Sequence, residues 1–302
     1  METSNKKITG GIALAILAAS LYAVNAPFSK LLLAYVPPTL MAGLLYVGAG
    51  VGMGLIALVR RARHASASEA PLSRADLPFV LGMILLDILA PIFLMMGLSA
   101  TSAANASLLN NFEIVATALI ALAIFREQIS PRLWGGIFFV TFSCALLSFE
   151  DLSAFSFSGG SLFVLLAALC WGLENNCTRK LSATDPLTIV LLKGIFSGTG
   201  SLVIGLCLGE RTCQVLAILA VLLVGFVAYG LSIFTYVYAQ RSLGAARTSA
   251  YYAVAPFIGS ALSLIVFREL PRPAFFIALA LMALGAFLCA SDKPLFQKKQ
   301  QN

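Results

Sequence analysis

Four ionisable residues, Asp87, Glu113, Glu174 and Lys193, fall inside long apolar stretches of this sequence. A charge in such a place is costly unless it has a partner, contacts water or is neutralised. A carboxyl group there can exchange a proton or bind the ammonium group of a ligand, as we expect for Glu174 and Asp87. Our candidates for proton coupling are Asp87, Glu113 and Lys193. The alternatives are a purely structural ion pair, above all for Asp87, and a Lys193 side chain that extends to the nearby end of its helix.

Two aromatic residues each precede a polar residue by three positions: Tyr22 precedes Asn25, and Trp171 precedes Glu174. This spacing puts both members of a pair on one face of a helix. A ring beside a hydrogen-bonding group suits an amphipathic ligand that carries a ring, through stacking and a polar bond. We therefore predict that these four residues bind ligand. The competing interpretation is packing between helices with a polar bond across the interface.

A further pair of polar positions recurs along the chain. Ser107 and Asn110 have the same spacing as Ser249 and Tyr252, which lie 142 residues later. If the two segments are related, both pairs face a shared axis. The predicted lining of a cavity on that axis is Asn110, Phe112, Tyr251 and Tyr252. Pro256 then introduces a kink that exposes backbone carbonyl groups, although a kinked helix that only packs is the alternative.

The composition indicates which elements hold these residues. Of the 302 residues, 60% are hydrophobic and 11% are charged, whereas a soluble domain has about 25% charged residues. Most of the surface must therefore face lipid, and a helix needs about 20 apolar residues to cross a bilayer. We predict ten spans, at residues 8–33, 40–59, 77–98, 103–125, 133–148, 159–177, 186–208, 215–240, 248–267 and 274–290.

The distribution of basic residues predicts the orientation. If the N-terminus is cytoplasmic, fifteen Lys and Arg residues fall on the inside and four on the outside, as the positive-inside rule requires. We therefore expect a multi-pass protein of the inner (plasma) membrane with both termini in the cytoplasm. The first apolar stretch is too long for a cleavable signal peptide and is expected to be retained. Because the positive charges follow the membrane, we expect lipid contacts and no nucleic-acid partner.

An internal repeat is visible at two corners. Phe125-Arg126-Glu127 and Phe267-Arg268-Glu269 each end a predicted span, 142 residues apart. The repeat divides the chain into residues 1–149 and 150–302, with five spans in each part. Because five is odd, the second part must enter the membrane in the opposite sense. We predict an all-α fold of ten transmembrane helices in two inverted five-helix repeats, an architecture that favours transport by alternating access.

The starts of the two halves, Ala18 to Pro27 and Ala167 to Asn176, together with the Phe-Arg-Glu corners, resemble the ten-helix EamA-type branch of the drug/metabolite transporter superfamily. The fourth span departs from the pattern, with Glu113 and Ile114 where the second half has Ala255 and Pro256. The segment from Asn110 to Glu113 is similar to that of bacterial aromatic amino-acid exporters. The resemblance implies export of aromatic and other neutral amino acids. A broad-specificity exporter of drugs or other metabolites, or a channel, is the alternative.

Other functions lack their motifs. The single histidine, His64, lies in a basic loop, so neither a Ser–His pair nor a His-Glu-x-x-His zinc site can form inside the membrane. A nucleotide-binding Gly-x-x-x-x-Gly-Lys-Ser/Thr loop is missing as well. The six cysteines have no spacing typical of a metal site or a disulfide framework. We expect no enzymatic activity, no metal and no cofactor, with a small-molecule substrate as the partner of a monomeric protein.

Overall fold

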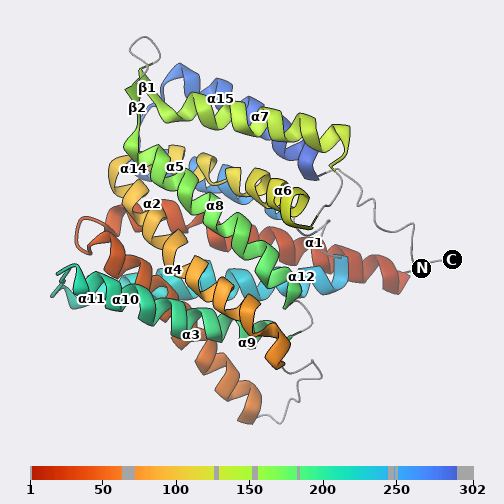
Figure 1. The fold of residues 1–302 in the computed structure, drawn as a ribbon, viewed down its shortest axis with the longest axis vertical. Coiled ribbons are helices and arrows are strands. Elements are labelled where there is room, and N and C mark those ends of the chain that lie inside the picture. The colour runs from red at the N-terminus through yellow and green to blue at the C-terminus, as the bar shows by residue number, and fades with distance from the viewer. Residues whose placement is uncertain are drawn as a thin grey trace.

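The computed structural model describes residues 2–62, 72–125, 129–151, 156–181, 184–243, 248 and 251–290. These residues form a bundle of helices that run side by side across the molecule (Figure 1). Within this part of the chain, eight helices are long and apolar enough to cross a membrane, and Ala255–Phe267 and Pro273–Cys289 are shorter apolar helices. The prediction of a helical, multi-pass membrane protein is therefore confirmed, while ten spans stay a prediction.

The first half of the chain, residues 1–149, supplies these elements: α1 (Glu2–Ala23), α2 (Asn25–Leu32), α3 (Pro38–Ala62), η1 (Arg74–Asp76), α4 (Leu77–Ala100), α5 (Ala103–Leu109), α6 (Phe112–Phe125) and α7 (Pro131–Ser148). A small antiparallel hairpin, β1 (Phe149–Asp151) and β2 (Ser156–Phe157), joins the halves. The second half supplies α8 (Gly159–Lys180), α9 (Pro186–Leu192), η2 (Lys193–Ser197), α10 (Gly198–Cys207), α11 (Val215–Gly225), η3 (Phe226–Leu231), α12 (Ser232–Leu243), α14 (Ala255–Phe267) and α15 (Pro273–Ala290).

Local sequence explains several helix ends. Pro131 begins α7, and the Ser130 hydroxyl accepts a hydrogen bond of 3.1 Å from the Leu133 amide, which caps that helix. Pro273 begins α15. Arg268 of the second Phe-Arg-Glu corner adopts a φ of 52° and so ends α14. Arg126 and Glu127 of the first corner lie outside the described residues.

Three of the apolar stretches are broken near their middle. The first breaks at Val24 between α1 and α2, the fourth at residues 110–111 between α5 and α6, and the ninth at residues 253–254 before α14. Two more stretches contain a wide turn, because η2 and η3 are π-helical. Breaks and π-helical turns free backbone groups from the helical ladder and are common at functional sites.

The packing of helices follows a repeating pattern across the two halves. Helix α1 packs on α12, and α8 packs on α4; likewise α14 packs on α1, and α6 packs on α8. Helix α3 lies against α10, and α7 lies against α15. Figure 1 shows α7 and α15 side by side at one edge of the bundle, and it shows the start of α1 and the end of α15 on the same side of the bundle. These pairings are the ones that a two-fold relation between the halves would produce.

Glycines let α3 approach its neighbours closely. A Cβ atom at Gly194 in η2 would lie 2.3 Å from the Gly50 Cα, and one at Gly225 would lie 2.0 Å from the Leu45 carbonyl oxygen. These distances leave no room for a side chain at either position. Gly50 of α3, Gly194 and Gly225 therefore allow backbone-to-backbone packing of these helices.

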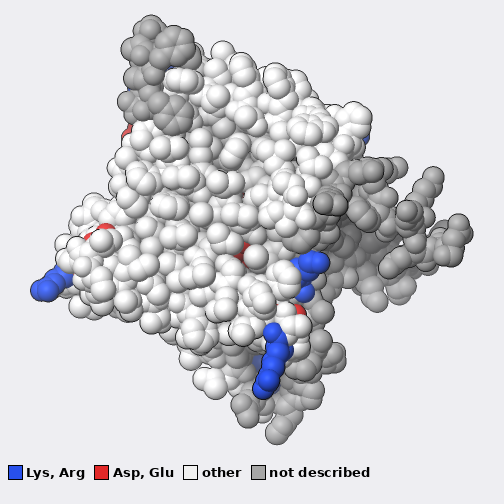
Figure 2. Space-filling model, viewed as in Figure 1, with Lys and Arg blue, Asp and Glu red and all other residues white. Residues whose placement is uncertain are grey.

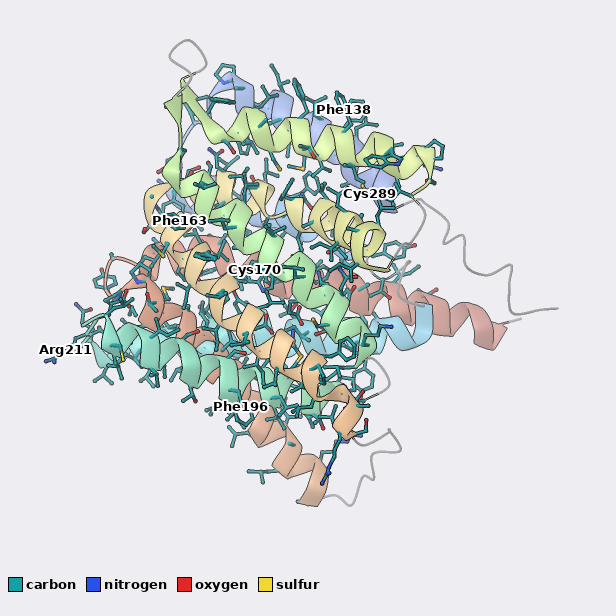
Figure 3. All side chains as sticks on the ribbon, in the orientation of Figure 1. Phe138, Phe163, Cys170, Phe196, Arg211 and Cys289 are labelled. Carbon is teal, nitrogen blue, oxygen red and sulfur yellow. The ribbon has the colours of Figure 1, made fainter. Side chains whose placement is uncertain are left out.

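The surface matches a lipid-facing protein. Figure 2 shows charged side chains near the two ends of the bundle on the visible face, with a wide band between them that is nearly all uncharged apart from a small recessed acidic spot. Phe138 and Phe196 are 63% and 53% exposed and project from the bundle, whereas Arg211 lies at one end of it (Figure 3). An apolar band bounded by charges is what a bilayer requires.

Candidate functional site

The structure brings three of the four intramembrane ionisable residues into one cluster. The Lys193 Nζ lies 2.7 Å from the Glu174 Oε1 and 3.0 Å from the Asp87 Oδ2. All three side chains are buried, and they come from three separate elements, η2, α8 and α4. Lys193 therefore does not extend to the end of its helix. We call Asp87, Glu174 and Lys193 the charge cluster.

Two hydroxyl groups complete the charge cluster. The Tyr46 hydroxyl of α3 donates a hydrogen bond of 2.8 Å to the Asp87 Oδ1, and the Thr178 hydroxyl donates to the Glu174 Oε1. Tyr46 is almost fully buried. Sequence reasoning missed it, because a tyrosine in a Gly-rich apolar stretch looks like a packing residue.

Tyrosines extend from the charge cluster through the bundle. The Tyr46 ring lies 5.0 Å from the Tyr229 ring in η3, which lies 6.0 Å from the Tyr22 ring. The Tyr22 ring lies 6.0 Å from the Tyr252 ring, which contacts Tyr236 at 4.9 Å. This row, Tyr46, Tyr229, Tyr22, Tyr252 and Tyr236, is the tyrosine row. Of these five tyrosines, only Tyr22 and Tyr252 were predicted from the sequence to belong to the site.

Two asparagines at the helix breaks bind the tyrosine row. The Asn110 Nδ2 donates to the Tyr22 hydroxyl at 3.0 Å, and the Asn25 Nδ2 donates to the Tyr229 hydroxyl at 3.1 Å. The Asn25 Oδ1 accepts from Ser29 at 2.9 Å. The Asn110 Oδ1, by contrast, is buried without a hydrogen-bond partner among the described residues. The site thus presents a free acceptor.

A small cavity of about 20 Å³ lies where the three broken helices meet. Its volume suffices for about one water molecule. The lining residues come from both sides of the first break, from α5 and Asn110 at the second, from the start of α14 after the third, and from α4: Tyr22, Ala23, Asn25, Ala26, Leu94, Ala106, Ser107, Asn110, Ala255, Pro256 and Gly259. The structure therefore places Tyr22, Asn25 and Asn110 in one cavity with the kink residue Pro256. Ser249, the predicted equivalent of Ser107, lies outside the described residues.

Among the described residues, Glu113 forms no hydrogen bond or ion pair with the charge cluster. Its Oε1 accepts a hydrogen bond of 2.6 Å from Asn175 on α8, and the same amide contacts the Thr117 hydroxyl at 3.4 Å. In the described part of the chain, no Lys or Arg forms an ion pair with Glu113. Glu113 is therefore held by neutral groups.

The remaining predicted residues are not among those that line the cavity. Trp171 is buried in the main apolar core, and Phe112 packs against that core. The Tyr251 side chain is 37% exposed, while Tyr252 lies in the tyrosine row with its hydroxyl 3.4 Å from that of Ser232. Glu174, which was predicted to pair with an aromatic neighbour around a ligand, instead pairs with Lys193.

The described residues contain no group of three or more His, Cys, Asp or Glu side chains that could hold a metal ion. None of the six cysteines, all of which lie in the described residues, forms a disulfide. The chemistry within reach of the cavity is therefore hydrogen bonding from amides and hydroxyls, ring stacking, and charge in the neighbouring cluster.

Comparisons with known proteins identify the relatives of this bundle. The model of the EamA-like transporter family matches residues 9–149 and 158–291. The chain belongs to the EamA-like transporter family. Membership in the EamA-like family makes it a membrane transporter of small molecules rather than an enzyme.

Two curated relatives of this EamA-like transporter are named as transporters. An uncharacterized transporter of Methanothermobacter thermautotrophicus is 28% identical over 270 residues, which cover 84% of this chain and 78% of that protein. The uncharacterized transporter YyaM of Bacillus subtilis is 24% identical over 218 residues, which cover 68% of this chain and 71% of that protein. One crystal structure is similar with a TM-score of 0.65 and 19% identity, over 92% of this chain and 94% of that one. That likeness shows a shared fold.

Proposed function

We propose that this EamA-like transporter exports aromatic and other neutral amino acids by alternating access. The observation that carries the proposal is the cavity at the three helix breaks. It joins a tyrosine ring, two asparagine amides and the ends of two helices in the middle of an apolar bundle. Amphipathic solutes with a ring and two charged groups suit such a lining.

Each part of an aromatic amino acid has a counterpart in the lining. The first residues of α2 and α14, Asn25 and Ala255, border the cavity, and helix N-termini attract a carboxylate. The unpaired Asn110 Oδ1 can accept a hydrogen bond from the ammonium group. The Tyr22 ring, which contacts the rings of Tyr229 and Tyr252, offers a stacking surface for the substrate ring.

The cavity must widen during the cycle. A volume of about 20 Å³ is far below the space that an amino acid needs, so substrate can bind here only after this cavity has opened. The breaks at Val24, residues 110–111 and residues 253–254 are the positions where half-helices can tilt. Opening alternately toward the two sides of the membrane would then expose the same residues to each side.

The predicted architecture supports this mechanism. The family model matches each half separately, the helix pairings recur between the halves, and the breaks in the fourth and ninth stretches occur at similar positions. We propose ten spans in two inverted repeats, residues 1–149 and 150–302, with both termini on the cytoplasmic side of the inner membrane. The charge distribution between loops supports that orientation.

Counterflow in proteoliposomes tests the proposal. Vesicles that contain the purified protein and an unlabelled aromatic amino acid should accumulate the labelled form transiently, and a quaternary-ammonium drug should not compete.

Asn110→Ala should raise KM about fivefold, since the loss of one buried hydrogen bond costs about 1 kcal/mol. Asn105→Ala is the matched control, because Asn105 lies on the same helix α5 and does not line the cavity. Counterflow of the drug alone would refute the amino-acid assignment, and labelled flux that unlabelled substrate cannot accelerate would favour a channel.

A further inference from the structure

The charge cluster carries more acidic than basic groups. Two carboxyl groups, Asp87 and Glu174, share one ammonium group, Lys193, so the fully ionised cluster has a formal net charge of −1. Among the described residues, no second Lys or Arg forms an ion pair with either carboxyl group. An uncompensated buried charge is unfavourable in a bundle that faces lipid. The cluster can remove it by binding one proton.

The groups around the charge cluster do not supply the missing positive charge. Tyr46 faces it from α3, Cys177 from α8, Glu113 from α6 and Tyr229 from η3. These neighbours are neutral or acidic groups. They can exchange hydrogen bonds with the carboxyl groups, but they cannot neutralise a second carboxylate. The proton must therefore come from water on one side of the membrane.

The contacts of the two carboxyl groups favour Glu174 as the one that takes the proton. The Asp87 Oδ1 accepts a hydrogen bond from the Tyr46 hydroxyl, and its Oδ2, which has no hydrogen-bond partner, faces the Lys193 ammonium group at 3.0 Å in an ion pair, where a proton would be repelled. In Glu174, the Thr178 hydroxyl and Lys193 both contact Oε1. Within the described part of the chain, no side chain donates to the Glu174 Oε2. That oxygen is therefore free to bind a proton.

The charge cluster is connected to the cavity by contacts. Asp87 binds the Tyr46 hydroxyl, the Tyr46 ring packs at 5.0 Å from the Tyr229 ring, and the Tyr229 hydroxyl binds Asn25 of the cavity lining. Lys193 and Tyr229 both lie in π-helical turns, which are frequent at functional sites. A change of charge at the cluster can thus alter the lining of the cavity.

We propose that the charge cluster is the proton-coupling site of this transporter, with Glu174 as the group that binds and releases the proton. The inference rests on the proposed function for its substrate. Protonation converts the Glu174 carboxylate to a neutral carboxylic acid and weakens its bond to Lys193, while Lys193 stays paired with Asp87. The link between α8 and η2 is then loosened. One proton enters as one amino acid leaves.

A pH gradient across the proteoliposome membrane tests the coupling. With the membrane potential clamped, acid-loaded vesicles of the wild-type protein should accumulate labelled amino acid from a more alkaline medium, about tenfold for a gradient of about one pH unit and one proton per substrate. The quantity to compare is the ratio of gradient-driven accumulation to gradient-free counterflow. Glu174→Gln should abolish the gradient response and retain measurable counterflow.

Glu113→Gln is the matched control, because Glu113 is also a carboxyl residue within the apolar bundle but lies outside the charge cluster. It should keep the wild-type ratio of accumulation to counterflow. A wild-type protein with strong counterflow and no response to the gradient would refute proton coupling and leave the proposed function standing. A Glu174→Gln variant that keeps the response would refute the assignment of the proton to Glu174.

A second measurement needs no substrate. The chain has two tryptophans, and the buried Trp171 lies one helical turn before Glu174. In a Trp134→Phe protein, the emission of Trp171 should change with pH, and adding Glu174→Gln should remove that change. Emission that does not respond to pH in the Trp134→Phe protein would overturn the inference. A pH response that depends on Glu174, without counterflow of any amino acid, would support the proton site and refute the proposed substrate.

Discussion

The side-chain amide of Asn110 donates a hydrogen bond of 3.0 Å to the hydroxyl of Tyr22. The two residues are 88 positions apart, and each borders the break of its own span. The bond therefore ties two broken helices together at the cavity. Any movement that widens the cavity between α1 and α5 must lengthen or exchange this bond.

Tyr22→Phe removes the hydroxyl that accepts this bond and keeps the ring. We expect KM for an aromatic amino acid to rise about fivefold, as for Asn110→Ala, and the double variant to be little worse than either single variant. The reason is that the Tyr22 hydroxyl positions the Asn110 amide, so both substitutions lose the same bond from Asn110 to the substrate ammonium group, which is worth about 1 kcal/mol. KM values from counterflow with the wild type, the two single variants and the double variant measure the coupling energy between the two substitutions. Tyr35→Phe, at an exposed tyrosine, is the control, and strictly additive effects would contradict the coupling.

Lys193→Met leaves Asp87 and Glu174 buried without their shared cation. We expect a loss of about 3–5 kcal/mol in stability, because removing one partner of a buried ion pair leaves an uncompensated charge. The triple variant Lys193→Met with Asp87→Asn and Glu174→Gln should recover most of this loss. Thermal unfolding in detergent measures both. Equal stability of the single and triple variants would show that the charge cluster is not held as ionised groups.

Gly194→Ala places a methyl group 2.3 Å from the Gly50 Cα. The backbones of α3 and η2 must then separate, and we expect a destabilisation of about 1–3 kcal/mol. Gly54→Ala is the matched control on α3, since a Cβ atom there has its nearest neighbour at 3.7 Å. The melting temperatures of the two variants measure the difference. Gly194→Ala should have the lower melting temperature. Equal melting temperatures of the two variants would show that α3 and η2 do not touch at this point.

Glu210 caps the start of α3. Its carboxylate oxygens accept hydrogen bonds of 2.8 Å from the Leu40 amide and 3.3 Å from the Thr39 amide. Glu210→Ala should therefore lower stability by about 1 kcal/mol, and Glu210→Gln should lose less because its amide oxygen still accepts. Arg211→Gln, at the neighbouring position at the end of the bundle (Figure 3), is the control. If Glu210→Ala and Arg211→Gln have equal melting temperatures, the cap contributes nothing.

Sequence patterns predicted the positions of the helices better than they predicted the contacts between side chains. Apolar stretches and proline positions placed the helices, and the charges of Asp87, Glu174 and Lys193 marked them as unusual. Their pairing could not be predicted, because Asp87 and Lys193 are 106 residues apart and meet only through the packing of α4 on η2. The expected partnership of Glu174 with Trp171 around a ligand was replaced by an ion pair with Lys193.

The breaks and wide turns were also hard to predict. Pro256 marked the kink before α14, and Pro27 removes the helical bond to the Ala23 carbonyl beside Val24, but residues 111–114 after Asn110 contain no proline or glycine. Tyr46 and Tyr229 looked like core aromatics, because only their distant partners Asp87 and Asn25 give them polar roles. The π-helical turns η2 and η3 both pack against α3, a contact between distant segments that no local pattern predicts.

The pairing of α1 with α12 has a consequence for biosynthesis. Residues of these helices are joined by contacts more than 200 positions apart, such as the bond of 2.9 Å from the Ser232 hydroxyl to the Ala18 carbonyl. A ribosome therefore releases α1 and α3 into the membrane long before their partners α12, η2 and η3 are made. The early helices must wait in the bilayer as separate inserted segments. The charge cluster can assemble only after translation has passed residue 193, and the tyrosine row only after it has passed residue 252.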